Sequence, residues 1–120
     1  MVTEQRAHQR FRTYRPARVA PAHRHLLEIL TKDLSAGGAR CVSPTLVPVG
    51  SKLHIEVVLF AGEQPVRADG QIVWIRTIPE SEQFELGIAF QHVSERDRQR
   101  LSSCLSRLSH RLSAEVVPAV

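Results

Sequence analysis

Two short groups of polar residues have side chains that suit a phosphate-bearing or ring-edge ligand. Arg6 and Arg10 form an R-x-x-x-R pattern, the arginine motif, and Asp33, Ser35 and Gly38 form a D-x-S-x-x-G pattern, the Asp-Ser-Gly motif. Arginine presents a planar fork of N–H donors that fits phosphates and guanine edges. An aspartate accepts paired N–H donors, and a serine hydroxyl donates or accepts. These residue types predict binding of a ligand with such groups.

The two motifs differ in specificity. An R-x-x-x-R pattern also fits residues 96–100 and 107–111, and about one or two matches are expected by chance in so Arg-rich a chain. A D-x-S-x-x-G pattern is expected by chance in roughly one such sequence in a hundred. Taken alone, Asp33 and Ser35 also fit an ordinary cap at the end of a strand, in which the side chain bonds nearby backbone. Both interpretations stay open for the isolated motif.

Gly38 has two possible roles, and three residues outside the motifs are further candidates. Gly38 would let backbone approach a ligand or adopt a positive φ. Gly37 lies in the same turn and Arg40 follows it, so both are weaker candidates for ligand contact. Trp74, the only tryptophan, could stack on a base, which is worth about 1–3 kcal/mol. It fits a core or rim aromatic equally well, so its role is left open.

The elements that position these residues are short β-like runs between turn formers, typical of an all-β sheet or barrel. The expected strands are Arg18–Ala20, Arg24–Thr31, Ala39–Ser43, Lys52–Phe60, Val66–Thr77 and Phe84–Gln91. Within residues 52–57 polar and apolar side chains alternate, which predicts one buried and one exposed face. Residues 33–38 are expected to form a turn between two of the strands.

An amphipathic helix is expected after the last strand. Leu101, Leu105, Leu108 and Leu112 fall on one face at helical spacing. Ser94 is a suitable N-cap for this helix, because its hydroxyl can accept a hydrogen bond from an amide of the first turn.

Composition limits the class of protein. The chain has 120 residues, 42% of them hydrophobic, which suits one domain with one core. It lacks an apolar run near the ~20 residues of a membrane span and a secretory signal, so a cytoplasmic protein is expected. Cys41 and Cys104 have no metal-ligand spacing and are expected to be reduced packing residues. Arginine supplies 14 of the 16 basic residues, which fits phosphate binding or a high-GC genome.

In order and spacing, the two motifs resemble those of the PilZ domain family. The segments 70–74 and 86–90 also resemble the family's late, Trp-containing strand and its closing strand. The resemblance implies a six-stranded antiparallel β-barrel followed by a C-terminal amphipathic helix. It also implies cyclic di-GMP as the ligand, with no other cofactor and no metal. This ligand offers two phosphates and guanine edges with acceptors on one side and N–H donors on the other.

The resemblance assigns ligand contacts to the residues of both motifs and, more weakly, to three of their neighbours. The first group is Arg6, Arg10, Asp33, Ser35 and Gly38, and the second is Gly37, Arg40 and Trp74. Residues 1–16 are expected to be a flexible Arg-rich arm, 17–114 the barrel and helix, and 115–120 a tail. Ligand binding is expected to order the arm and to regulate an unidentified protein effector.

Two other functions are alternatives to this receptor. A PilZ adaptor that does not bind nucleotide is the alternative, although such members typically lose the motifs that this chain retains. A barrel that binds single-stranded nucleic acid fits the net charge of +4 but not the presence of only six aromatic residues. The sequence has neither a G-x-x-x-x-G-K phosphate loop nor a G-x-S-x-G elbow. We therefore expect no enzymatic activity, no membrane insertion and no nucleic-acid partner.

Overall fold

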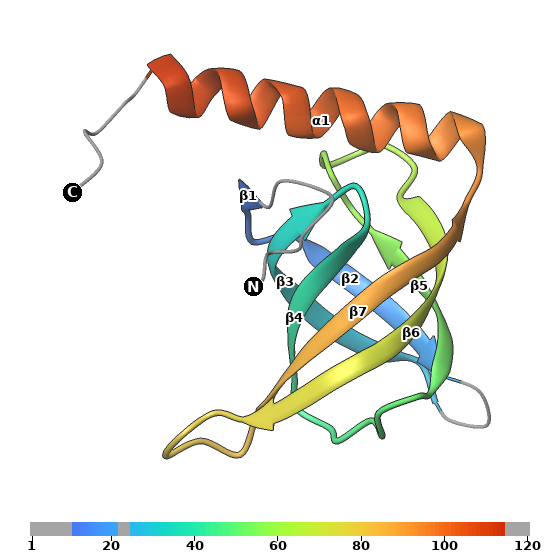
Figure 1. Ribbon diagram of the computed structural model, residues 1–120, viewed down its shortest axis with the longest axis vertical. Helices are drawn as coiled ribbons and strands as arrows, with labels where there is room; N and C mark the ends of the chain where they lie inside the picture. Colours follow the sequence, from blue (N-terminus) through green and yellow to red (C-terminus); the bar gives the residue numbers. More distant parts are fainter. Residues whose placement is uncertain (1–10, 22–24, 115–120) are drawn as a thin grey trace, which may run out of the picture.

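Residues 16–21, 52–57 and 66–72 alternate between more buried and more exposed side chains, so these segments turn one face toward a common core. The structure, a computed structural model, describes residues 11–21 and 25–114 (Figure 1). The elements in chain order are β1 (Phe11–Arg12), β2 (Pro16–Pro21), β3 (Leu27–Ser35), β4 (Gly38–Ser43), β5 (Lys52–Val57), β6 (Val66–Thr77), β7 (Phe84–Val93) and α1 (Glu95–Ala114).

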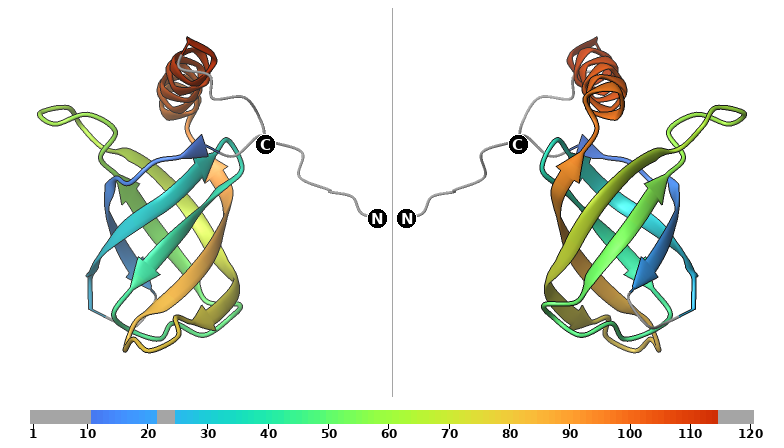
Figure 2. Two further views of the ribbon diagram at one scale, coloured as in Figure 1. Left: turned by 90° about the vertical axis from the view of Figure 1, so that its left-hand side faces the viewer. Right: turned by 90° about the vertical axis from the view of Figure 1, so that its right-hand side faces the viewer.

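Six of the strands close into an antiparallel barrel. They follow the order β3-β2-β5-β6-β7-β4, and β4 pairs with β3 to complete the ring (Figure 2). β1 adds to the C-terminal part of β3, where Phe11 lies opposite Leu34 and Arg12 lies opposite Asp33. Closure joins the two edges of the sheet to each other. The all-β, six-stranded barrel expected from the sequence is confirmed.

A single cluster of buried apolar side chains fills the barrel. Its nearly fully buried members include Leu34, Ile55, Ile72, Leu86 and Ile88, each at most 2% exposed. Complete burial of such a side chain contributes roughly 1.5–3 kcal/mol relative to exposure. Both cysteines belong to this cluster, with Cys41 0% and Cys104 1% exposed. They are packing residues, and burial raises the pKa of the Cys41 thiol to about 12.

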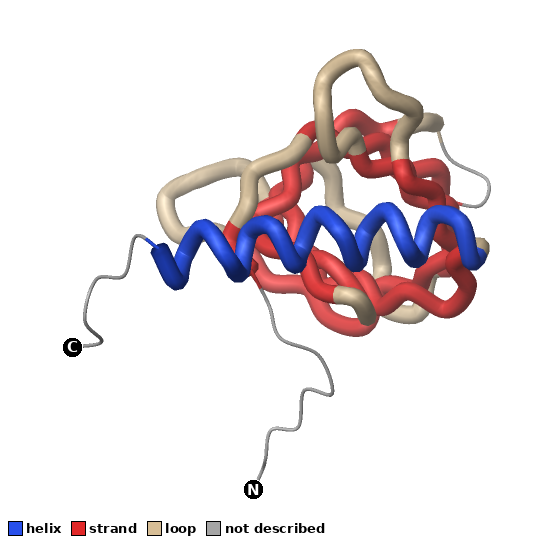
Figure 3. Tube along the Cα trace, turned by 90° about the horizontal axis from the view of Figure 1, so that it is seen from above, coloured by secondary structure: helices blue, strands red, loops and turns tan. Residues whose placement is uncertain are grey.

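The helix α1 lies across one end of the barrel (Figure 3). Its first turn is capped by Ser94, whose Oγ accepts a hydrogen bond from the Asp97 amide at 3.2 Å, as the sequence predicted. Leu101 and Leu105 point into the core and are 3% and 6% exposed. The helix therefore closes the apolar interior at this end. Within the described part of the chain, no helix is both long and apolar enough to cross a bilayer.

Polar contacts fix the start of α1 to the loop between β5 and β6. Arg100 donates from Nη1 to the Pro65 carbonyl at 3.3 Å and from Nη2 to the Gln64 carbonyl. The same guanidinium lies 3.1 Å from Asp97 Oδ1, while Asp97 Oδ2 accepts the Arg67 amide at 3.0 Å. One of the alternative R-x-x-x-R matches thus contributes to docking of the helix.

The structure corrects some expected strand ends. The strand expected at 24–31 is β3, which continues to Ser35, so Asp33 and Ser35 lie within a strand and only residues 36–37 form the turn. A register shift between Thr31 and Asp33 marks a bulge, which hides the strand in the sequence pattern. The strand expected at 52–60 ends at Val57, whereas the expected bounds of β6 agree with the structure.

Candidate functional site

The Asp-Ser-Gly motif forms the β3–β4 hairpin. Ser35 lies opposite Gly38 across a two-residue turn. The Ser35 hydroxyl accepts the Gly37 amide at 3.2 Å and donates to the Gly38 carbonyl at 3.4 Å. Ser35 as a whole residue is 4% exposed. In this conformation its hydroxyl stabilises the turn, in agreement with the cap interpretation.

Gly38 is required by close packing between strands. A Cβ at this position would lie 2.3 Å from the Ile88 carbonyl oxygen, which is backbone of β7. Among the described glycines, only Gly50 and Gly62 have a positive φ. The sequence-based suggestion of a positive φ at Gly38 is therefore wrong, and lack of space beside β7 is the physical reason for glycine there.

Four strands bring candidate residues from distant parts of the sequence into one line. Asp33 of β3 lies opposite Arg40 of β4, Arg40 opposite Gly87 of β7, and Gly87 opposite Trp74 of β6. Directly opposed residues of antiparallel strands share a face of the sheet. The neighbours Leu34, Leu86 and Ile88 point into the core, so this line lies on the outer face. We call Asp33, Arg40, Gly87 and Trp74 the site row.

Asp33 and Arg40 form an ion pair at one end of the site row. Arg40 Nε lies 2.9 Å from Asp33 Oδ2, with the two side chains 29% and 10% exposed. Arg12 lies opposite Asp33 on the other side and is exposed. A buried acceptor is thus held between two strands that carry guanidinium groups, and these groups are more exposed than the carboxylate.

Trp74 lies at the other end of the site row, on the outer face and half-buried. Its indole passes directly over Gly87, because a Cβ on Gly87 would be 2.1 Å from Trp74 Nε1. The Arg76 guanidinium lies over the ring at 5.9 Å from its centroid. Of the alternatives left open by the sequence, the core position is excluded and an accessible rim position is observed.

A carboxylate that the sequence analysis missed lies beside the site row. Glu85 of β7 is 2% exposed although its neighbours Leu86 and Phe84 belong to the core side. Lys32, Arg40 and Arg76 all approach it. Burial alone would raise the Glu85 pKa, but hydrogen bonds from Lys32 and Arg76 and the nearby charges outweigh it, so this pKa lies below its usual value. Glu85 lies two residues before Gly87, so both fall on the outer face of β7. This spacing is the sequence signal that could have identified Glu85.

The arginine motif cannot be placed in the same way. Arg6 and Arg10 lie outside the described residues, which begin at Phe11. Arg10 directly precedes Phe11 in the sequence, and Phe11 pairs with Leu34, next to Asp33. The described chain thus begins beside the Asp33 end of the site row.

A family model for the PilZ domain matches residues 4–107. The chain belongs to the PilZ domain family. The match includes both motifs and every residue of the site row.

Solved structures share the fold of this PilZ domain at low sequence identity. The PilZ domain of YcgR from Escherichia coli with c-di-GMP is 21% identical, with 95% of this chain and 100% of that chain covered and a TM-score of 0.72. The Bacillus subtilis inhibitor of motility MotI/DgrA is 19% identical, with 90% and 53% covered and a TM-score of 0.74. The MrkH–c-di-GMP complex of K. pneumonia is 17% identical, with 96% and 57% covered and a TM-score of 0.76.

The PilZ domain spans only about half the length of MotI/DgrA and of MrkH, at 53% and 57% of those chains. Among curated proteins, none matches the chain in sequence.

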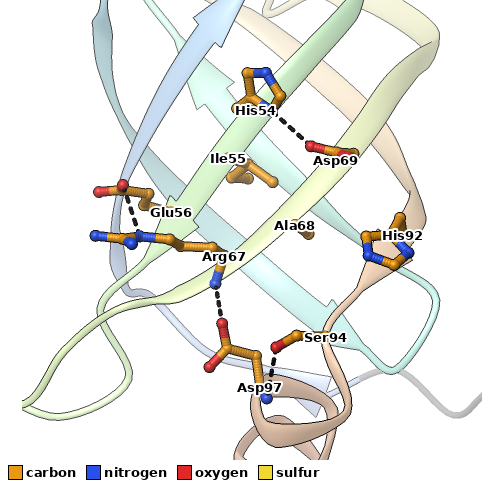
Figure 4. A pocket seen from close by; sticks show the side chains of 9 residues that line it. All are labelled: His54, Ile55, Glu56, Arg67, Ala68, Asp69, His92, Ser94 and Asp97. Carbon is orange, nitrogen blue, oxygen red and sulfur yellow. Dashed lines mark hydrogen bonds and ion pairs between the residues drawn. The ribbon is translucent and has the colours of Figure 1, made fainter.

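A groove lies on a different part of this PilZ domain, away from the site row. It has a volume of about 640 Å³, runs over β5, β6 and the start of α1 and contains none of the predicted site residues (Figure 4). Its polar groups pair across the strands: His54 Nδ1 lies 2.5 Å from Asp69 Oδ1, and Arg67 Nε lies 3.1 Å from Glu56 Oε2. Within the described residues, no three metal-ligating side chains group together. Both of these ion pairs join β5 to β6.

Proposed function

We propose that this PilZ domain is a receptor that binds cyclic di-GMP on the outer face of the barrel and thereby regulates a protein partner. The arginine motif and the site row form the binding surface in this proposal. The observation that carries it is the line of Asp33, Arg40 and Trp74 on the outer face of the barrel, beside the strand that follows Arg10.

Each side chain of the site row offers a contact that a cyclic dinucleotide needs. The Asp33 carboxylate accepts N–H donors of a guanine edge. The Arg40 guanidinium suits phosphate oxygens or the O6 and N7 acceptors of guanine. The Trp74 indole supplies a flat surface for a base. Arg6 and Arg10 add two further guanidinium groups for the phosphates and the second guanine edge.

The residues of the turn contribute mainly through shape. Ser35 uses its hydroxyl for two contacts within the hairpin, and Gly38 allows β4 to lie close against β7. Together they fix the end of β3, which carries Asp33. In the proposal, Gly37 leaves the turn open to the ligand.

The position of β1 supports the proposed regulation of a partner. The strand β1 contacts both β3 and α1, and the arginine motif directly precedes it in the chain. A ligand held by Arg6, Arg10 and Asp33 therefore acts on a segment that touches the helix. A change of this segment on binding alters the surface that a partner meets.

Isothermal titration with cyclic di-GMP, GTP and a short single-stranded oligonucleotide tests the proposal. We expect a saturable signal with cyclic di-GMP only, and its loss in an Arg6→Ala, Arg10→Ala double variant. Binding of the oligonucleotide alone would favour a nucleic-acid-binding barrel. Absence of binding to all three would leave the PilZ adaptor that does not bind nucleotide, and the receptor function would be abandoned.

A further inference from the structure

Glu85 is a buried carboxylate on the outer side of the barrel wall. Its side chain is only 3% exposed, although residues that face outward on a sheet are ordinarily solvated. A buried charge must be paired to be tolerated. The groups that pair with Glu85 come from three other strands, which makes this residue a point of convergence.

The contacts of Glu85 connect the two ends of the site row. Arg76 of β6 donates to Oε1 at 2.7 Å from Nε, and its Nη2 lies 2.6 Å away. Lys32 of β3 donates to Oε2 at 2.9 Å. Arg40 of β4 places Nη1 3.8 Å from Oε1 while its Nε contacts Asp33. The Glu85 carboxylate therefore contacts both Arg40, which pairs with Asp33, and Arg76, which lies over the Trp74 ring.

Two bulges aim the side chains at Glu85. The register of β3 shifts between Thr31 and Asp33, at Lys32, and that of β6 shifts between Ile72 and Trp74, at Val73. A bulge reorients the side chains that follow it and is common beside functional sites. Lys32 thus reaches β7 across β4, and Arg76 lies directly opposite Glu85.

We propose that Glu85 is a positioning residue of the cyclic di-GMP site, which holds the guanidinium groups of Arg40 and Arg76 in place for the ligand. This inference rests on the proposed function. An arginine side chain has many rotamers and loses entropy when a ligand fixes it. Because Glu85 already restrains both side chains, the ligand meets a preorganised surface, which strengthens binding.

A positioning role and a purely electrostatic role of Glu85 predict opposite changes in ligand affinity when its charge is removed. A carboxylate close to the binding site of a dianionic ligand repels the phosphates, so its removal would strengthen binding if charge alone mattered. If Glu85 holds the arginines, its removal weakens binding even though the surface becomes more positive. The sign of the change in affinity therefore decides between the two roles.

The test compares Glu85→Gln with the matched variant Glu56→Gln. Glu56 lies on β5, three strands from β4 in either direction around the barrel. Its side chain is 35% exposed and forms an ion pair with Arg67 at 3.1 Å. By titration with cyclic di-GMP we expect roughly five- to twentyfold weaker binding for Glu85→Gln and a change within about twofold for Glu56→Gln. Equal or tighter binding by Glu85→Gln would overturn the assignment.

A second variant covers the case in which Glu85→Gln does not fold. Arg76 is 65% exposed as a side chain, so Arg76→Lys keeps both the charge and the fold but loses the paired donors. We expect this variant to bind more weakly as well. Where Glu85→Gln does fold, the double variant should lose less than the sum of the two effects. Full additivity or unchanged binding by Arg76→Lys would contradict positioning.

Fluorescence of Trp74, the only tryptophan, gives a readout without ligand. Arg76 lies over its ring, so release of this guanidinium by Glu85→Gln should alter emission, and Glu56→Gln should not. If the unsubstituted protein fails to bind cyclic di-GMP, the proposed function falls and this assignment falls with it. If it binds and Glu85→Gln binds equally well, only the role of Glu85 is refuted.

Discussion

Gly87 leaves the space in which the Trp74 indole lies, so Gly87→Ala should displace this side chain. An added Cβ would come within 2.1 Å of Trp74 Nε1, 2.3 Å of Cε2 and 2.6 Å of Cδ1. Ordinary contacts between heavy atoms are about 3.5–4.0 Å, so the ring would have to move by more than about 1 Å. Because the clash is with a side chain on the outer face, the ring can turn away while β7 keeps its place.

The expected effect on binding exceeds the effect on folding. Overpacking costs about 1–3 kcal/mol, and the lower end applies at Gly87 because the obstructing group is an accessible side chain. A stacked base contributes about 1–3 kcal/mol, so displacement of the Trp74 ring should weaken cyclic di-GMP binding by roughly 5- to 150-fold. Calorimetric titration measures the affinity, and tryptophan emission reports the ring directly.

Val73→Ala is a suitable control, because Val73 is adjacent to Trp74 and 49% exposed. It should leave emission and affinity close to those of the unsubstituted protein. If Gly87→Ala left tryptophan emission unchanged, the indole would not lie over Gly87. If emission changed and affinity did not, the ring would lie there without contacting the ligand.

Three further predictions concern separate parts of the chain. Arg6→Ala and Arg10→Ala should each weaken cyclic di-GMP binding by roughly 10- to 150-fold in titrations, since each charged contact contributes about 1.5–3 kcal/mol. The melting temperature should change little. Unaltered binding by the double variant would remove both residues from the site. Gly38→Ala should lower the free energy of unfolding by at least about 1–3 kcal/mol, since its Cβ would meet the Ile88 carbonyl oxygen at 2.3 Å and backbone cannot turn away. A denaturation midpoint equal to that of the unsubstituted protein would argue against the close approach of β4 and β7. Ser94→Ala should cost about 1 kcal/mol of stability through loss of the N-cap, and an unchanged unfolding curve would mean that the first turn of α1 is capped by other means.

The regular elements could be predicted because their sequence signals are local. The alternation predicted for residues 52–57 is seen in β5, Leu101 and Leu105 of α1 are buried, and Ser94 caps the helix as expected. Asp33 was harder, because Asp and Ser are typical turn residues. It belongs to a strand only because Arg12 and Arg40 pair with it from both sides. Such partners come from other parts of the chain and leave no mark in the residues around Asp33.

Glu85 shows what sequence patterns could not supply. A glutamate between Phe84 and Leu86 fits an outward, solvated position in an alternating strand. It is buried because Lys32, from a bulge of β3, and Arg76, opposite it on β6, lie over it. The burial of this residue depends on the register of three strand pairs, and that register appears only once the barrel has closed.

The site row also links ligand binding to folding. Its members come from residues 33 to 87 of the sequence and lie together only when β4 has paired with both β3 and β7. An unfolded chain cannot present this row, so a ligand that bridges it binds the folded state alone. By mass action, such a ligand at 100 times its Kd raises the free energy of unfolding by about 2.7 kcal/mol. Under the proposed function, resistance to proteolysis and to heat would then rise with the concentration of cyclic di-GMP, and the lifetime of the protein would depend on its ligand.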